Sequence, residues 1–269
     1  MVETELYRPK GQFTNSEIPT RDISAGIEHV LTDAEFTFKL VSINGAGPLP
    51  QKVDGFRETI VVKDGSIDVM LTENGTTRTE RLVKDDGVYV PAEAVREIRA
   101  VNGESTLIVA ASAPMTVNPA YKGNFGTWTP EQYFFSLEKE GRFPQVYHID
   151  KPWGGEDWLT VLSDGHVLKR ISMNAGFRCS YQKHFFKLET NYLIEGEARL
   201  LLEDEHGIDQ TTIIKPGEGW YVPVPRRHRV FADKPYVAFE VSTPEVDDIE
   251  RMADDSGRGD GRVTTEHKK

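Results

Sequence analysis

The chain has 269 residues, enough for two ordinary domains, and its 38% hydrophobic and 28% charged content is typical of a globular protein with a core. Its net charge of −11 argues against a nucleic-acid backbone or an anionic membrane as partner, because both would repel an acidic protein. No apolar run approaches the roughly 20 residues of a membrane span. The first residues lack the apolar segment of a signal peptide, and the single cysteine, Cys179, leaves no internal disulfide, so we expect a cytoplasmic protein.

The first part of the chain is predicted to be an arm followed by a β domain. Residues 1–25 are polar and show no sustained period, so we interpret them as an N-terminal arm. Short runs of β-forming residues then alternate with Gly, Pro, Asp and Asn, at 36–43, 59–62, 67–71, 88–90 and 106–109. This spacing is typical of a β-sandwich or barrel, which we predict over residues 26–116.

Helix signals follow in two places. Residues 117–144 break the β pattern and are predicted to form a linker, in which a capping residue, a proline and a terminal glycine indicate a helix over 129–141. A second β-rich stretch occupies residues 145–246. A similar pattern over 243–253 predicts another helix, so we assign residues 247–269 to a C-terminal helix and a polar, disordered tail.

Four side chains in the second β stretch are candidate metal ligands. Gln182 and His184 are two residues apart and would point to the same face of a strand. A turn through residues 185–188 would then bring Glu189 back on the neighbouring antiparallel strand. His228 follows a short strand flanked by Pro and Gly and would supply the fourth ligand. This mixed nitrogen and oxygen set suits one divalent transition metal, Zn, Mn, Fe, Co or Ni.

The two β stretches also resemble each other. Residues 51–59 align with 182–190 at an offset of 131, and residues 87–91 align with 219–223 at an offset of 132. Matching segments at a nearly constant offset indicate an internal duplication. The chain is therefore predicted to contain two copies of one β domain.

The first copy lacks two of the ligand types. Val53 stands in place of His184, and Arg96 stands in place of His228. An arginine beside the remaining Glu58 would repel a divalent cation, so we predict that the N-terminal barrel has no metal site. Three roles stay open for Arg96: a small anion pocket, a buried pair with Glu58, or exposure to solvent.

The second β stretch resembles the two-motif pattern of the cupin superfamily. It has a glycine, the spacing Gln-x-His-x4-Glu, a second glycine and then a strand ending in histidine. A closer resemblance, over residues 145–258, is to the cupin domain of type II mannose-6-phosphate isomerases, alone or fused to mannose-1-phosphate guanylyltransferase. It rests on residues 151–154 (KPWG), 168–171 (LKRI), 180–184 (SYQKH), 223–228 (PVPRRH) and 247–251 (DDIER). The chain departs from that family at 185–187 (FFK) and 190–191 (TN), at the predicted mouth of the site. The resemblance implies an all-β fold of two tandem cupin barrels (double-stranded β-helix, jelly-roll) joined by a helical linker.

The resemblance also implies a metal-dependent aldose-ketose isomerase acting on a small sugar phosphate. A metal would chelate two adjacent sugar oxygens while a base, which the sequence does not identify, moves a proton. An anionic sugar needs cations, and only one of Lys169 and Arg170 can face inward on a strand. Four residues are selected for this substrate-binding role: Arg170, Arg178, Lys187 and Arg226.

Two alternatives from other classes stay open, because a fold does not determine a function. One is an Fe- or Ni-dependent cupin dioxygenase acting on a small acidic substrate, and the other is a non-catalytic sugar-binding bicupin. Exposed strand edges and the N-terminal arm favour a homodimer. Cys179 has no acid-base partner nearby in the sequence, so we do not expect it to be a nucleophile.

Overall fold

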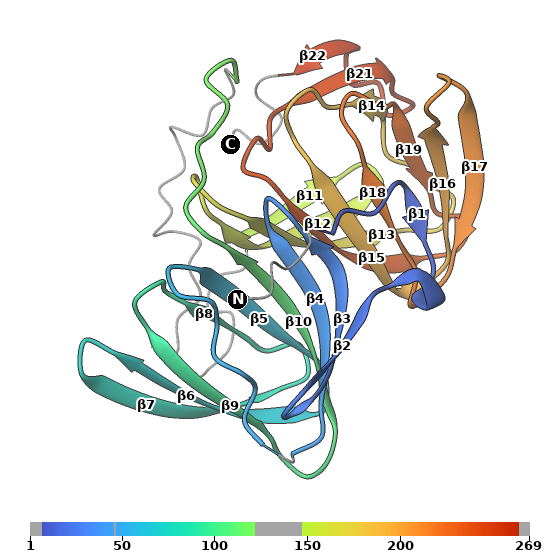
Figure 1. Cartoon of the computed structure of the whole chain (residues 1–269). Coiled ribbons are helices and arrows are strands. Elements are labelled where there is room, and N and C mark those ends of the chain that lie inside the picture. Colours follow the sequence, from blue (N-terminus) through green and yellow to red (C-terminus); the bar gives the residue numbers. More distant parts are fainter. Residues whose placement is uncertain (1–6, 46, 122–146, 264–269) are drawn as a thin grey trace. The chain divides into compact units, whose positions relative to one another are not determined.

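The computed structural model describes residues 7–45, 47–121 and 147–263, and the regular structure of these residues is almost entirely β-strand (Figure 1). One 3-10 turn, η1 (Asn15–Glu17), accompanies them. No helix in this part of the chain is long and apolar enough to cross a membrane. The chain divides into two compact units, of which the first contains the described residues 7–8 and 18–115 and the second contains 9–17, 116–121 and 147–263.

The first unit consists of two antiparallel sheets, with strand orders β2-β3-β4-β10-β5-β8 and β7-β6-β9. The strands are β2 (Thr20–Ile23), β3 (Gly26–Asp33), β4 (Thr37–Ile43), β5 (Arg57–Asp64), β6 (Ser66–Glu73), β7 (Thr76–Val83), β8 (Gly87–Val90), β9 (Val95–Ala100) and β10 (Ser105–Ser112). On β6, Ile67, Val69 and Leu71 are buried while Asp68 and Met70 are not, as expected where one face of a strand covers a core. The core is mostly Val, Ile and Leu from both sheets.

The second unit has a seven-stranded sheet, β1-β18-β15-β20-β13-β12-β11, and a six-stranded sheet, β17-β16-β19-β14-β21-β22. The strands are β1 (Gln12–Phe13), β11 (Tyr147–Lys151), β12 (Gly154–Val161), β13 (Val167–Met173), β14 (Tyr181–Lys183), β15 (Glu189–Gly196), β16 (Ala198–Glu203), β17 (Asp209–Ile214), β18 (Gly219–Val222), β19 (His228–Phe231), β20 (Tyr236–Ser242), β21 (Ile249–Ala253) and β22 (Gly261–Val263). Trp153, Leu193, Leu200 and Trp220 contribute to its core.

The predicted N-terminal arm belongs partly to each unit. Its strand β1 extends the seven-stranded sheet by pairing with β18, where Gln12 lies opposite Trp220. A Cβ added to Gly219 would lie 2.3 Å from the backbone oxygen of Asn191 and 2.5 Å from the ring of Phe13, so glycine is required at this close approach. The next arm strand, β2, instead pairs with β3 in the first unit.

The helix predicted over residues 243–253 is wrong, because residues 249–253 form strand β21. This strand pairs with β14 on one side and β22 on the other. Tertiary pairing outweighs local helix signals here, and β22 lies within the stretch predicted to be a disordered tail. The linker helix predicted over 129–141 lies outside the described residues.

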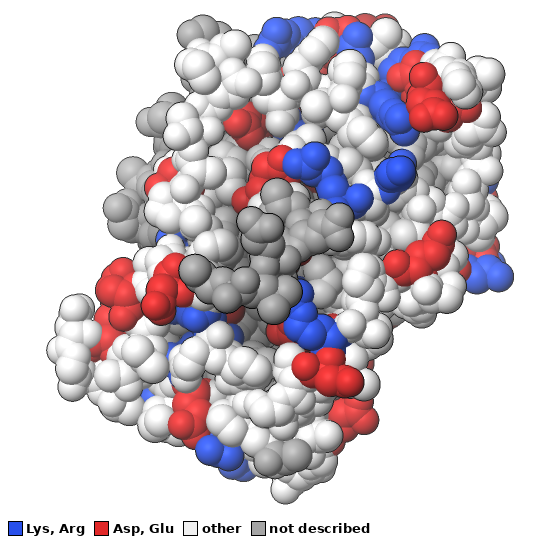
Figure 2. All heavy atoms as spheres, viewed as in Figure 1, with Lys and Arg blue, Asp and Glu red and all other residues white. Residues whose placement is uncertain are grey.

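Charged side chains of both signs are interspersed on the face shown in Figure 2. Lysine and arginine there lie beside aspartate and glutamate instead of gathering in one broad patch.

A buried ion pair occupies the first unit at the positions aligned with the metal ligands of the second. Arg96 Nε lies 2.8 Å from Glu58 Oε2, and Arg96 Nη2 lies 3.1 Å from Glu58 Oε1. Arg96 Nη1 also donates to the carbonyl oxygens of Pro50 and Leu49, at 2.6 and 3.3 Å. Three roles were left open for Arg96, and the structure shows that it forms the buried ion pair with Glu58.

We expect Arg96→Met to lower the free energy of unfolding of the first unit by about 3 to 5 kcal/mol, because it leaves Glu58 buried without a partner. The double variant Glu58→Leu/Arg96→Met should recover much of that loss, since both charges are removed together. Urea unfolding measures both. Arg81→Met, which breaks an exposed two-bond pair with Asp68, is the control and should have little effect. Equal losses of unfolding free energy in the Arg96 and Arg81 variants would contradict a buried ion pair between Arg96 and Glu58.

Candidate metal centre

The three strongest metal ligands converge from the two sheets of the second unit. His184 follows β14, Glu189 begins β15 and His228 begins β19. The predicted return of Glu189 on a strand next to β14 is wrong, because β14 lies in the six-stranded sheet and β15 in the seven-stranded sheet. Residues 184–188 thus cross between the sheets, and the carboxylate approaches the two imidazoles from the opposite side.

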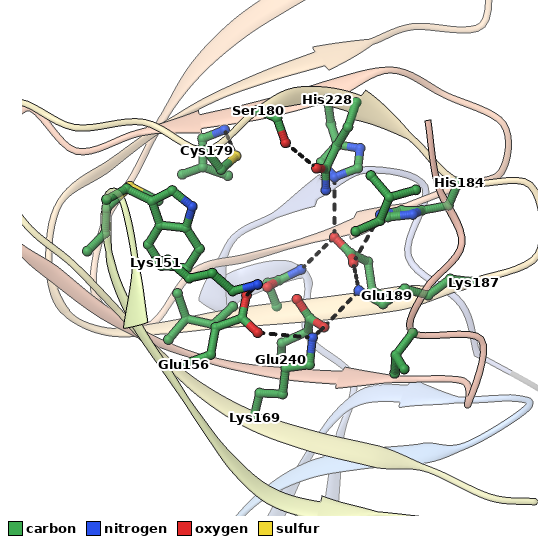
Figure 3. Close-up of a pocket in the computed structure, with 18 of the residues that line it drawn as sticks. Lys151, Glu156, Lys169, Cys179, Ser180, His184, Lys187, Glu189, His228 and Glu240 are labelled. Carbon is green, nitrogen blue, oxygen red and sulfur yellow. Dashed lines mark hydrogen bonds and ion pairs between the residues drawn. The ribbon is translucent and has the colours of Figure 1, made fainter. Parts of the chain in front are cut away.

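The geometry of this cluster suits one divalent ion. His184 Nε2 lies 3.6 Å from Glu189 Oε2, and His228 Nε2 lies 3.6 Å from Glu189 Oε1 (Figure 3). The candidate ligand atoms all lie within 4.8 Å of one another, and all three residues are buried. Two imidazoles and one carboxylate form a donor set that suits several transition metals.

The imidazoles are held in the form that binds metal. His184 Nδ1 donates a hydrogen bond to the backbone oxygen of Asp248, which directs the lone pair of Nε2 toward Glu189. His184 Nε2 is buried and has no hydrogen-bond partner among the described residues. Burial and the nearby charge of Lys187 lower the pKa of His184 to about 3, and burial lowers the pKa of His228. Both rings are therefore neutral near pH 7, and a divalent ion fits the site.

Gln182, the fourth predicted ligand, lines the same cavity and lies opposite His228 in the pairing of β14 with β19. Its Oε1 accepts a hydrogen bond from Ser180 Oγ at 2.6 Å. A carbonyl oxygen has two lone pairs, so one is left for a metal. Gln182 as a ligand stays a prediction.

Of the four predicted substrate-binding cations, only Lys187 lines the cavity. Arg170 alternates with Lys169 on β13, and it is Lys169 that points inward, with its Nζ 4.1 Å from the ring centre of Trp158. Arg178 is half exposed and pairs with Asp255 at 2.7 Å. Arg226 lies in the turn before β19, outside the residues that line the cavity.

Most of the charged residues that line the cavity are not among the site residues predicted from the sequence. Three lysines and three glutamates alternate along its wall and end at the metal ligands, in the order Lys151, Glu156, Lys169, Glu240, Lys187 and Glu189. The successive Nζ to Oε distances are 3.8, 3.5, 3.4, 2.8 and 2.5 Å. None of these side chains is more than 10% exposed, so we call them the buried charge chain (Figure 3). The two-residue periodicity of strands could have identified some of them, because residues two apart on a strand share a face. Glu156 shares a face with Trp158, and Lys169 shares a face with Ile171.

The charge chain keeps the carboxyl groups of Glu156 and Glu189 ionised despite burial. Burial raises the pKa of Glu156, but Lys151 and Lys169 outweigh it and lower that pKa to about 2. In the same way burial raises the pKa of Glu189, while Lys187 beside it holds the pKa well below its usual value. Burial lowers the pKa of Lys187, but Glu189 and Glu240 raise it above its usual value. The three lysines and three glutamates of the buried charge chain carry equal numbers of formal positive and negative charges.

The loop that carries Lys187 is pinned by Asp248. Asp248 Oδ2 accepts the backbone N–H groups of Phe185, Phe186 and Lys187 at 2.6, 2.5 and 3.0 Å. The backbone oxygen of the same residue holds His184. One residue just before β21 therefore positions both a metal ligand and the cation next to it.

The whole chain was compared with known proteins. No protein-family model and no curated protein matches it. Among solved structures, a mutant form of Bacillus subtilis oxalate decarboxylase matches 87% of this chain and 77% of its own, with a TM-score of 0.61 and 14% identity. A structure of the same enzyme that addresses its Mn(II) centres also matches 87% of this chain and 77% of its own, with a TM-score of 0.60 and 17% identity.

The fold is that of a bicupin. Identity this low supports the fold alone, so the predicted fold of two cupin barrels is confirmed, while the likeness to mannose-6-phosphate isomerases is not shown. In this bicupin the candidate metal ligands lie in the second barrel, inside a cavity of about 680 Å³ that includes part of its opening to solvent.

The one cysteine of the bicupin lines the same cavity. Cys179 is partly buried, and its Sγ accepts the backbone N–H of Val230 at 3.1 Å. Burial raises the pKa of its thiol to about 11. Because the thiolate is the reactive form, this thiol is a poor nucleophile near pH 7.

We expect the purified bicupin, loaded with a divalent transition metal and freed of excess, to retain about one equivalent per chain. His184→Ala should lose it, because only two of the three clustered ligands remain. His206→Ala alters an exposed histidine after β16 and is the matched control. Elemental analysis measures the content, and a His184→Ala variant that retains the wild-type amount would contradict the assignment.

Alkylation of Cys179 tests its environment. At pH 8 a thiol with a pKa of about 11 holds roughly a hundredfold less thiolate than one with the ordinary value of 9.0. Iodoacetamide should therefore modify the folded protein about a hundredfold more slowly than the urea-unfolded protein, as followed by mass spectrometry. Equal rates would show that the thiol is not buried and that its pKa is not raised.

Proposed function

We propose that this bicupin is a metal-dependent enzyme that uses O2 to oxidise a small acidic substrate, the class of reaction carried out by cupin dioxygenases. The observation that carries the proposal is the cluster of His184, Glu189 and His228. Two histidines and one carboxylate with open positions are the donor set of non-haem iron oxygenases. A divalent redox metal held there would supply coordination sites for O2 and substrate.

The surroundings of the cluster suit an anionic substrate of modest size. Lys187 Nζ is the ammonium nearest to the ligands, and we propose that it binds a substrate carboxylate. Met173, Val246 and Ile249 add apolar wall that limits water near the metal ligands. The solved structures with the same fold are named for their action on oxalate, which is a small acid.

Isomerisation of a sugar phosphate has less support. It relied on a phosphate site built from arginines, but Arg170, Arg178 and Arg226 lie outside the cavity. The lysines within the cavity are already paired with glutamates. A phosphate dianion would need two or more of these lysines released from their partners, whereas a single carboxylate needs only Lys187.

The decisive experiment supplies the protein with Fe(II), Mn(II), Ni(II) or Zn(II) in separate samples and records O2 uptake with a panel of small mono- and dicarboxylates. We expect uptake with a redox metal and none with Zn(II). Lys187→Met should raise KM for the carboxylate by about 10- to 100-fold, the usual value of a hydrogen bond to a charged group. Arg178→Ala is the surface control and should behave as the wild type.

The same samples distinguish the alternatives. Oxygen-independent interconversion of aldose and ketose 6-phosphates by the Zn(II) protein would favour the isomerase. Binding of a sugar without turnover, whichever metal is supplied, would favour a non-catalytic bicupin. Either result would overturn the oxygenase proposal.

A further inference from the structure

Lys187 contacts an oxygen that a metal would also use. Its Nζ lies 2.5 Å from Glu189 Oε2, and this oxygen faces His184 Nε2 at 3.6 Å. The same Nζ lies 2.8 Å from Glu240 Oε1. One buried ammonium thus bridges a metal-ligand carboxylate and a second carboxylate that is not among the clustered ligands (Figure 3).

Electrostatics opposes simultaneous contact of Glu189 Oε2 with this ammonium and a divalent ion. Both are cations, and their repulsion is poorly screened in a buried site. Glu240 offers Lys187 an alternative within its present reach. Since Asp248 holds the backbone of residues 185–187, a shift from Glu189 to Glu240 requires movement of the side chain alone.

The first barrel provides an independent comparison. Glu58, which aligns with Glu189, pairs with a protein cation in the same way, but this cation is Arg96. The remaining nitrogen of that guanidinium binds the backbone oxygens of Leu49 and Pro50, which fix it in place. Arg96 is thus held by two backbone oxygens besides Glu58, whereas Lys187 already contacts a second carboxylate, Glu240, that can retain it without Glu189.

We propose that Lys187 and the metal exchange at Glu189, with Glu240 accepting Lys187 when the metal binds. This inference rests on the proposed function and deepens it. Metal loading then leaves an ammonium beside the metal with one of its carboxylate contacts released. That ammonium is available to a substrate carboxylate only after the metal is in place, so the metal prepares the anion site.

The test is the affinity for Zn(II), measured by competition with a chromophoric chelator in four variants. Lys187→Met removes the competing cation and should bind Zn(II) about tenfold or more tightly than the wild type. Glu240→Gln removes the alternative partner, so Lys187 remains on Glu189 and Zn(II) should bind more weakly. Lys234→Met removes an exposed lysine of the same unit and should leave the affinity unchanged. His184→Ala should abolish tight binding. Thermal melts verify that each variant is folded.

The opposite signs expected for Lys187→Met and Glu240→Gln separate exchange from a merely structural role, which would weaken binding in both. Unchanged or weaker binding by Lys187→Met overturns the exchange but leaves the metal centre and its proposed chemistry intact. If neither the wild type nor Lys187→Met binds Zn(II) more tightly than His184→Ala, both the metal centre and the exchange are overturned.

Discussion

The site in the second barrel depends on how the negative charge of one buried carboxylate, that of Glu189, is balanced. Glu189 is 5% exposed, and an ionised carboxylate at such a position is stable only with close partners. It has two imidazole nitrogens at 3.6 Å, one on each oxygen, and an ammonium at 2.5 Å. The neutral imidazoles supply lone pairs and Lys187 supplies charge, which is why this group can serve both as metal ligand and as the end of a charge chain.

The duplicated barrels meet the same constraint in different ways. In the first barrel the guanidinium of Arg96 donates one hydrogen bond to each carboxylate oxygen of Glu58. In the second, histidine stands at the position aligned with Arg96, so the positive charge must come from a lysine or a metal. Two changes, Arg96 to His228 and Val53 to His184, thus separate a barrel closed by its own ion pair from one that can accept an ion.

The charge chain also explains why the cavity can contain so many ionisable groups. Each lysine from Lys169 to Lys187 lies between two carboxylates, and the charges alternate without a break as far as Glu189. Removing one member would leave its neighbours buried with fewer partners, a cost that is large in a low-dielectric interior. Asp248 supports the arrangement from outside by holding the loop of Lys187 and the ring of His184.

The all-β class, the internal duplication and the spacing of Gln182, His184, Glu189 and His228 can be predicted from the sequence, because they depend on local periodicity and on aligned motifs. Which cations face the cavity depends instead on how the strands pair and pack. Alternation on β13 leaves Lys169 and Arg170 equivalent until strand pairing and packing on Trp158 choose one face. Glu240 is brought to the site by pairing across strands far apart in the chain. Residues 249–253 became a strand for the same reason, since partners on both sides outweigh local helix signals.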